Sequence, residues 1–440
     1  MDYKDYIYKL LGKIRAESLL NSQDEDSISC LRLNLLKTNK ESFEALFPNL
    51  DKHNYVNEAY YFSKSDFRFG KSPLHNAGMY YIQDASAMMV VKLLNIEEND
   101  KVLDMCAAPG GKSTQVASYL NNTGLLLAND VNHKRALALS ENIERMGIKN
   151  AVVSSESASK IANTFEGYFD KVILDAPCSG QGMFRKNEAV KDDWTYNKTL
   201  SLSTLQKELI LDSYKCLRRD GIMVYSTCTF AREENEEVIE YLLENTNASL
   251  INIDKEKDFD EAFNISEAIR LYPDKFKGEG HFIALIRCND DHQNRVSNYN
   301  KPASNKDIEI FRQFEKEHLN TDLQGTFIKM GDELHLLPKN TFALNNLKVL
   351  RNGLHLGKIV KNNFKPNHAL ALSLDKSLVK AYLNLDHESQ SANDYLKGLT
   401  LTIEGKKGYN LVCVNNTPLG WTKSDGSIHK NLYPKGLRNF

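Results

Sequence analysis

The stretch KVLDMCAAPGGKSTQ (residues 101–115) decides the fold, because a short apolar run of strand type passes through a glycine turn into a helical pattern. Two later stretches, VILDAPCSGQGMFRK (172–186) and MVYSTCTFAREENEEV (223–238), also begin as strands, and each reaches a cysteine where a parallel strand would end. In open α/β sheets, ligands gather at the carboxyl ends of the strands. The three stretches therefore predict that one ligand-binding loop and two thiols, Cys178 and Cys228, face a single crevice.

Residues 76–290 alternate between strand and helix patterns. Strand-type runs occur at KVLDM, GLLLAND, AVVSS, KVILDAP, IMVYSTC and HFIALIRC, and helical patterns at 112–121, 133–146, 203–218 and 233–245. Such alternation is typical of a mostly parallel sheet with helices on both faces. The predicted fold class is therefore α/β, with a doubly wound, Rossmann-like core.

The rest of the chain divides around this core. Residues 1–75 mix helical pattern, a strand-like LRLNLL run and a polar stretch, and predict a small α+β domain. Residues 291–306 are polar and predict a linker. Residues 307–440 carry helix and strand patterns and predict a second α+β domain. We thus expect an N-terminal portion at 1–75, a core domain at 76–290, a linker at 291–306 and a C-terminal domain at 307–440.

Composition narrows the class of protein. Among 440 residues, 41% are hydrophobic and 26% are charged, which is ordinary for a globular chain. No apolar run approaches the roughly 18 residues of a membrane span, and the N-terminus lacks an apolar signal core. The seven cysteines have no paired short spacing, so neither a zinc site nor a disulfide framework is expected. A reduced, cytoplasmic setting without metal or membrane follows as the expectation.

Charge is unevenly distributed along the chain. Residues 301–440 carry 20 Lys/Arg against 13 Asp/Glu, whereas the first 300 residues carry 36 against 45. A basic C-terminal third on an acidic body is consistent with a polyanion held through the tail. A chance excess in a domain of this size is an equally good explanation from charge alone.

The loop from Asp104 to Ser113 has the composition of a cofactor site. Small residues let the backbone approach a ligand, and a helix N-terminus offers free N–H groups. The loop matches neither the Walker pattern nor GxGxxG. The second strand ends at Asp130, whose carboxylate can accept both ribose hydroxyls of a nucleoside cofactor. The alternative for Asp130 is a cap on the following helix; with the loop in place, an adenosine-bearing ligand is favoured.

In this order and spacing, the three stretches quoted at the start resemble the RNA cytosine-5 methyltransferases of the NSUN/RsmB/RsmF superfamily. YYIQDASAM (80–88) matches the segment that these enzymes carry before the cofactor loop, and RLYPDKFKGEGHFIALI (270–286) matches their closing strands. LRNGLHLGKIVKNNFKPNHALALSL (350–374) and GWTKSDGSIHKNLYPKGLRN (420–439) are similar to the tail of the bacterial RsmF-like group, which ends in a PUA-like module. The resemblance covers nearly the whole chain.

The resemblance implies S-adenosylmethionine as the cofactor. Asp130 would take its ribose, with Arg135 nearby, and Asp175 would border both the cofactor and the target base. Many relatives carry an aspartate after the third strand, near the adenine, where this chain offers Glu156 and Ser157 instead. The methionine end would be held by the loop residues Cys106, Ala107, Ala108, Pro109, Gly110, Gly111 and Lys112.

Two cysteines suit this chemistry, because a thiolate added to carbon-6 of cytosine makes carbon-5 enamine-like and able to take a methyl group. The resemblance assigns the attack to Cys228 and product release to Cys178, places Asp175 at the cytosine edge, and lets Lys112 reach the pyrimidine carbonyl. DNA cytosine methyltransferases instead use the cysteine of the PC segment as nucleophile, but their glutamate segment is absent from this sequence. The remaining cysteines are expected to pack as small hydrophobes: Cys30, Cys106, Cys216, Cys288 and Cys413.

RNA contacts are expected at two places besides the tail. Arg32 and Asn34 in LRLN are similar to an RNA-contacting stretch of the family. Arg185 and Lys186 follow the PC segment and are expected to contact the flanking strand, unless MFRKN is simply a solvated loop. Trp421 in the tail is expected to be a core residue rather than a stacking platform.

The resemblance implies an S-adenosylmethionine-dependent RNA cytosine-5 methyltransferase whose partner is the RNA of the small ribosomal subunit. Nothing in the sequence demands more than a monomer. The alternatives are the same chemistry on transfer RNA or large-subunit RNA, and a non-catalytic RNA-binding assembly factor. Intact Asp175, Cys178 and Cys228 argue against the assembly factor. The missing glutamate segment and the basic tail argue against DNA or protein methylation.

Overall fold

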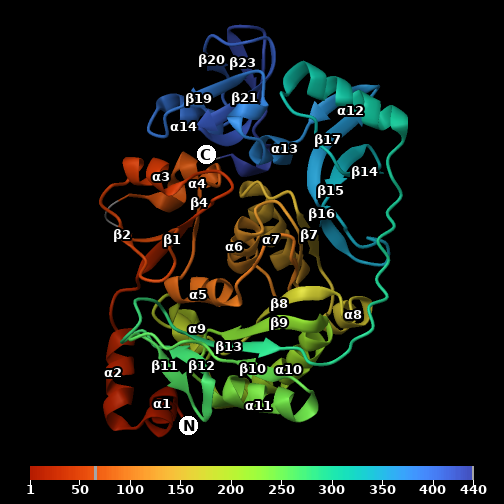
Figure 1. Ribbon diagram of the computed structural model, residues 1–440. Coiled ribbons are helices and arrows are strands. Elements are labelled where there is room, and N and C mark those ends of the chain that lie inside the picture. The colour runs from red at the N-terminus through yellow and green to blue at the C-terminus, as the bar shows by residue number, and fades with distance from the viewer. Residues whose placement is uncertain (64–66, 439–440) are drawn as a thin grey trace.

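The computed structural model describes residues 1–63 and 67–438 (Figure 1). Within them, the centre is a ten-stranded sheet of order β11-β12-β13-β9-β8-β5-β6-β7-β16, with β10 paired to β13. Its strands are β5 (Lys101–Asp104), β6 (Leu125–Asn129), β7 (Ala151–Ser154), β8 (Phe169–Asp175), β9 (Leu217–Thr227), β10 (Ser249–Ile251), β11 (Asp260–Ala262), β12 (Ile265–Leu271), β13 (His281–Arg287) and β16 (Val349–Asn352). The five strands from β9 to β7 are parallel, and antiparallel strands extend the sheet at both edges.

Helices cover both faces of this sheet, as the strand–helix alternation predicts. One face packs against α5 (Ala85–Leu94), α6 (Gly111–Tyr119) and α7 (His133–Arg145). The other packs against α8 (Ala158–Thr164), α10 (Tyr196–Lys215) and α11 (Glu236–Asn245). In α7 the buried side chains recur at helical spacing, namely Ala136, Leu139 and Ile143. The doubly wound α/β prediction is confirmed.

The N-terminal segment forms a small α+β unit. Helices α1 (Tyr3–Leu11) and α2 (Lys13–Gln23) are separated at Gly12, whose φ of 73° lies in the left-handed region that glycine tolerates. A four-stranded sheet of order β2-β3-β1-β4 follows. Its elements are β1 (Ser29–Leu33), α3 (Lys40–Leu46), β2 (Asp51–Lys52), β3 (Ala59–Phe62), α4 (Pro73–Asn76) and β4 (Tyr80–Ile82).

The C-terminal part contains two further sheets. Helix α12 (Asn305–His318) packs with the sheet of β14 (Thr326–Met330), β15 (Glu333–Leu337), β17 (Leu354–Val360) and β18 (Asn363–Pro366). After α13 (His368–Ser373), a five-stranded sheet has the order β19-β21-β22-β23-β20. Its strands are β19 (Tyr382–Leu385), β20 (Leu401–Thr402), β21 (Gly408–Val414), β22 (Thr417–Ser424) and β23 (Ile428–Asn431). Helix α14 (Gln390–Leu396) lies between β19 and β20 in the chain.

Segments far apart in the sequence share cores. Leu31 and Tyr60 of the N-terminal sheet and Phe43 of α3 are buried in one cluster with Leu383 and Val412 of the C-terminal sheet. Figure 1 shows α3 and α4 directly beneath α14 and β19. The N-terminal sheet and the C-terminal sheet therefore stabilise each other through a shared core.

The position of β16 bears on the expected division of the chain. This strand comes from the predicted C-terminal domain, yet it pairs with β7 as an edge of the central sheet. The boundaries at 75, 290 and 306 stay predictions.

None of the described helices is long and apolar enough to cross a membrane. Among the described residues, no group of His, Cys, Asp or Glu side chains is arranged to hold a metal ion.

Candidate active site

The two cysteines lie side by side because their strands are parallel neighbours. β8 and β9 pair in a register that sets Asp175 opposite Ser226, and each strand then turns into a loop that carries a thiol. The sulfur atoms of Cys178 and Cys228 are 3.3 Å apart, and both residues are half-buried and free. Hydrogen bonding to Cys228 and burial together raise the pKa of the Cys178 thiol well above its usual value. This shift favours the protonated form of the Cys178 thiol.

Next to the thiols lies an ion pair between Lys112 and Asp175. The Lys112 Nζ is 2.7 Å from Asp175 Oδ2, and the Ser226 hydroxyl donates to Asp175 Oδ1 at 2.8 Å. Burial opposes both charges, but the attraction between them outweighs it, so the pKa of Asp175 is lowered and the pKa of Lys112 is raised. The Cys228 sulfur is close enough to contribute to the raised pKa of Lys112. A fixed cation thus faces the second thiol.

A cavity of about 230 Å³ joins this pair to the predicted cofactor loop. Its lining comprises Tyr81, Ile82, Gln83, Ala87, Asp104, Cys106, Ala107, Ala108, Pro109, Gly111, Lys112 and Asp175. Gly110 has a φ of 112°, and a Cβ there would lie 3.0 Å from Leu139, so the turn requires glycine. The tight turn brings the N-terminus of α6 to the cavity, where N–H groups are free to bind a ligand.

Asp104 supplies an observation that tests whether a cofactor fits this cavity. One carboxylate oxygen accepts from the Ser113 hydroxyl at 2.6 Å, whereas the other is buried with no hydrogen-bond partner among the described residues. Burial raises the pKa of Asp104 to about 7. An unpartnered acid on the cavity wall suits a ligand with a cationic group, which the methionine ammonium of S-adenosylmethionine would provide.

Asp130 and Arg135 lie against the same loop. Asp130 Oδ2 accepts from the Ala108 N–H at 3.3 Å and is 3.4 Å from Arg135 Nη2, which donates to the Ala108 carbonyl at 2.7 Å. The cap of α7 is Asn132, so Asp130 does not cap that helix. The ribose contact of Asp130 stays a prediction, and in the structure both side chains brace the loop.

Glu156 and Ser157 follow β7, beside the loop, where the adenine contact was expected. Glu156 Oε1 accepts from the Lys348 N–H at 2.7 Å, and the Ser157 hydroxyl caps α8 through the Lys160 N–H. Asn129 holds the Glu156 backbone through both its N–H and its carbonyl. Adenine binding by these residues stays a prediction. The Glu156 carboxylate already accepts a hydrogen bond from Lys348, the residue just before β16.

The four residues expected to contact RNA are engaged within the protein. Arg32 and Asn34 are buried; Arg32 donates to the Gly111 carbonyl at 3.2 Å and Asn34 donates to the Met146 carbonyl at 2.8 Å. Neither side chain has exposed surface to offer to RNA. Arg185 is buried against Glu279, and Lys186, one quarter exposed, pairs with Asp84 and Glu279. Of these four side chains, only that of Lys186 is exposed enough to contact RNA directly.

Several polar residues at the site escaped the sequence analysis. Asp104, Tyr81 and Gln83 line the cavity, although the first was only a loop boundary and the other two lay in a segment quoted for resemblance alone. Glu234 and Asn235 are fully buried beneath the cysteine loops. The sequence predicts only a helical pattern at 233–245 there, so only the burial of these side chains identifies them.

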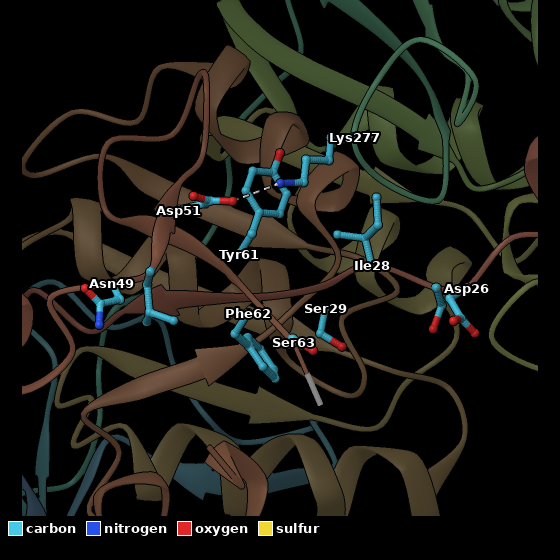
Figure 2. Close-up of a pocket in the computed structure, with 11 residues that line it drawn as sticks. Asp26, Ile28, Ser29, Asn49, Asp51, Tyr61, Phe62, Ser63 and Lys277 are labelled. Carbon is cyan, nitrogen blue, oxygen red and sulfur yellow. Dashed lines mark ion pairs between the residues drawn. The ribbon is translucent and has the colours of Figure 1, made fainter. Parts of the chain in front are cut away.

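A second cavity, of about 480 Å³, opens on the N-terminal sheet (Figure 2). Figure 2 shows Lys277 across the ring of Tyr61, with its ammonium paired to Asp51. The ammonium is 4.1 Å from the ring centroid and 3.5 Å from the Asp51 carboxylate. Among the described residues, Asp26, Asp51 and Lys277 are the charged side chains that line this cavity, and neither thiol is part of the lining. This cavity is separate from the predicted active site at the two cysteines.

Known family models match four successive segments of the chain. Residues 1–85 match the N-terminal domain of 16S rRNA methyltransferase RsmF, and residues 91–287 match 16S rRNA methyltransferase RsmB/F. Residues 313–374 match the first C-terminal domain of RsmF rRNA methyltransferase, and residues 382–439 match the PUA domain of methyltransferase RsmF. The PUA-like assignment of the tail is confirmed.

Individual relatives agree with the family models. The chain is 31% identical to the ribosomal RNA small subunit methyltransferase F of Vibrio vulnificus strain YJ016, over 85% of this chain and 82% of the relative. The protein of the same name from Psychromonas ingrahamii is 30% identical, over 84% and 81%.

Solved structures share the fold of the central part. A methyltransferase homologue from Pyrococcus horikoshii has a TM-score of 0.58 at 29% identity, over 64% of this chain and 93% of that one. The structure of NSun6 from Pyrococcus horikoshii with SFG has a TM-score of 0.60 at 23% identity, over 66% and 98%, and supports the fold alone. With relatives at this identity and coverage, the chain belongs to the RsmB/F family of 16S rRNA methyltransferases, in its RsmF group.

Proposed function

We propose that this protein methylates carbon-5 of cytidine in small-subunit ribosomal RNA through a covalent adduct on Cys228. Membership in the family makes it an S-adenosylmethionine-dependent methyltransferase of ribosomal RNA. The finer assignment is supported above all by one observation. Cys178 and Cys228 lie 3.3 Å apart at the edge where the Lys112–Asp175 pair and the cofactor cavity meet.

The cofactor, when bound, supplies an electrophilic methyl group on a sulfonium. The loop backbone from Cys106 to Lys112 would hold its methionine end, and the free oxygen of Asp104 would face its ammonium. Tyr81 and Gln83 also line the cavity. These residues exclude water and keep the electrophile next to the two thiols.

The electrostatics favour Cys228 as the attacking group. A thiolate at Cys228 gains from the Lys112 ammonium and accepts a hydrogen bond from the Cys178 thiol. Its sulfur forms a bond to carbon-6 as the carbon-5–carbon-6 double bond opens toward carbon-5. Asp175 is placed to accept from the cytosine amino edge, and Lys112 to donate to the pyrimidine carbonyl, where negative charge develops.

Release needs a base and a leaving group. After carbon-5 gains the methyl group, its proton passes to a base, the carbon-5–carbon-6 double bond forms again, and the bond from carbon-6 to Cys228 breaks. Cys178 stands next to the leaving sulfur, and its raised pKa favours the protonated thiol, so it can donate a proton to the departing thiolate. The target base must leave its stack to reach both thiols.

The residues of the active site do not distinguish one class of RNA substrate from another. The basic excess of the tail, with 14 Lys/Arg against 6 Asp/Glu in residues 341–440, supports a nucleic-acid substrate, and the match of the tail to the PUA domain of RsmF supports ribosomal RNA over transfer RNA. The relatives are named for the small subunit. We accordingly propose small-subunit RNA as substrate, a monomeric enzyme, and the cytoplasm as its compartment.

Transfer of labelled methyl from S-adenosylmethionine tests this proposal. Unmodified small-subunit RNA, small subunits, large-subunit RNA, transfer RNA and DNA are each offered, and the product is digested to nucleosides. We expect label in 5-methylcytidine from small-subunit material. Label in another nucleoside would contradict the two-thiol mechanism. Cofactor binding without transfer to any substrate would favour a non-catalytic assembly factor.

A further inference from the structure

The two cysteine loops are held from beneath by adjacent residues of one buried segment. Glu234 and Asn235 follow Cys228 in the chain, and neither has any exposed surface. Glu236, next along, forms a buried ion pair with Arg270 and anchors the segment to β12. Glu234 and Asn235 therefore sit on a rigid base under the site.

Glu234 brackets the Cys178 loop together with Gln206. The N–H of Ser179 donates to Glu234 Oε2 at 2.9 Å, and the Gln206 amide donates to the same oxygen at 2.9 Å. The Gln206 amide also donates to the Pro177 carbonyl at 2.8 Å. Both residues that flank Cys178 are thus fixed through Glu234 and Gln206. The second carboxylate oxygen, Oε1, is buried with no partner among the described residues.

Asn235 brackets the Cys228 loop in the same way. The Thr227 hydroxyl donates to Asn235 Oδ1 at 2.6 Å, and Asn235 Nδ2 donates to the Thr229 carbonyl at 3.0 Å. These are the residues on either side of Cys228. Both atoms of the Asn235 amide are used, because Oδ1 accepts a hydrogen bond and Nδ2 donates one.

The loops also contact each other directly. The Ser179 and Thr229 hydroxyls are 2.8 Å apart, the Gly182 N–H donates to the Cys228 carbonyl at 2.8 Å, and the Phe230 N–H donates to Gln181 Oε1 at 3.1 Å. The separation of the two sulfur atoms therefore depends on these contacts together with the hydrogen bonds that Glu234 and Asn235 make to each loop. A shift of about 1 Å in a reacting group lowers rates on the order of 100-fold.

We propose that Glu234 and Asn235 are positioning residues with different tasks: Glu234 holds Cys178 for product release, and Asn235 holds Cys228 for attack. This inference rests on the proposed function of the two thiols. It predicts that neighbouring residues in one segment have opposite effects on the covalent adduct. Loss of the Glu234 bracket leaves attack intact and traps the adduct, whereas loss of the Asn235 bracket prevents the adduct from forming.

The test uses the full chain, S-adenosylmethionine and unmodified small-subunit RNA, with the adduct measured on denaturing gels. Glu234→Asp withdraws the carboxylate from Ser179 by one methylene, and adduct is expected to rise by about tenfold while multiple turnover falls by 10- to 100-fold, roughly. Glu234→Gln keeps an oxygen that accepts from Ser179 and Gln206, and is expected to restore near wild-type behaviour. Asn235→Asp loses the donor to Thr229 and is expected to reduce adduct and turnover together.

The Cys178→Ala background separates the two tasks. Glu234→Asp added to Cys178→Ala is expected to leave the adduct level unchanged, because Glu234 acts through Cys178. Asn235→Asp added to Cys178→Ala is expected to lower the adduct. Glu237→Gln, a carboxyl-to-amide change next to this segment that is half-buried, is the matched control and is expected to behave like wild type. Unfolding temperature and cofactor affinity report whether each variant is folded.

Three results would overturn the inference. They are a fall in adduct with Glu234→Asp, equal impairment by Glu234→Asp and Glu234→Gln, or unchanged adduct with Asn235→Asp. Failure of the proposed function looks different, since Cys178→Ala alone would then leave no adduct. Adduct with Cys178→Ala but none with Glu234→Asp would refute only the positioning role of Glu234.

Discussion

The sulfur atoms of Cys178 and Cys228 lie 3.3 Å apart although 50 positions separate the residues in sequence. They meet because β8 and β9 are adjacent parallel strands whose carboxyl ends share one edge of the sheet. Only one of two thiols this close is readily ionised, because a second negative charge at that distance is strongly unfavourable. The raised pKa of Cys178, caused by its hydrogen bond to Cys228 and by burial, favours the protonated form of that thiol.

Different outcomes are expected when each thiol is removed. Cys228→Ala abolishes methyl transfer and adduct formation, because no group remains to attack carbon-6. Cys178→Ala permits attack and methyl transfer but leaves RNA covalently attached to the protein. Denaturing gels with labelled RNA distinguish the two. Active Cys228→Ala together with inactive, adduct-free Cys178→Ala would show that the roles are exchanged.

The Lys112–Asp175 pair is expected to matter for stability as well as for activity. Asp175→Asn removes the ion-pair partner of the Lys112 ammonium, which lowers the free energy of unfolding by up to about 3 kcal/mol, because Asp175 is 31% exposed. Denaturant unfolding measures this loss, and a Lys112→Met/Asp175→Asn double variant should lose less than the sum of the single changes. Lys198→Met, which breaks an exposed pair with Asp193, is the control and should change stability little.

The pKa shifts of Asp175 and Lys112 determine how the stability of the protein depends on pH. The pKa of Asp175 is lowered on folding, so its stabilisation is present at neutral pH and is lost as pH falls through its folded pKa. The pKa of Lys112 is raised, so its stabilisation is lost only as pH rises through its folded pKa. Between these limits the pair should contribute a constant amount. A loss of stability near pH 7 that disappears in Asp175→Asn would contradict this.

Asp104 is expected to make cofactor binding depend on pH near neutrality. Burial raises its pKa to about 7, so the carboxylate that faces the cavity is formed only as pH rises through that value. Affinity for S-adenosylmethionine should weaken by up to about tenfold for each pH unit below 7, as measured by calorimetry. Asp104→Asn should remove this dependence. A dependence that survives in Asp104→Asn would assign the titration to another group.

The same shift predicts the effect of Asp104 on stability without cofactor. An acid whose pKa is raised on folding destabilises the protein as pH rises from its unfolded value of 3.8 through its folded value of about 7. Asp104→Asn should therefore raise the unfolding temperature at pH 8 and change it little at pH 4. Equal changes at both pH values would mean that the effect comes from packing rather than charge.

Arg32 is expected to support cofactor binding rather than RNA binding. Its guanidinium is fully buried and donates to the Gly111 carbonyl, the Thr114 hydroxyl and Gln83. Arg32→Met should weaken cofactor affinity and stability, while RNA affinity at saturating cofactor stays unchanged. Arg219→Met, at an exposed arginine, is the control. Lower RNA affinity with intact cofactor binding would instead support a direct RNA contact.

Much of the fold followed from local patterns. The alternation over residues 76–290 predicted the parallel strands and the helices on both faces, because side-chain periodicity directly reflects which face of an element is buried. The glycine loop and the ends of β8 and β9 were placed correctly for the same reason. The pairing of β16 with β7 could not be predicted, since an antiparallel edge strand carries no pattern that names its partner.

By itself, the sequence determined the α/β core, the cofactor loop and the choice of two strand-end thiols, because each depends on residues close together in the chain. Tertiary structure alone decided the 3.3 Å approach of the sulfur atoms and the ion pair beside them. It also buried Arg32, which sequence resemblance had placed on RNA, and set Glu234 under the Cys178 loop. Burial and long-range hydrogen bonds depend on which elements pack together, and local sequence does not encode that choice.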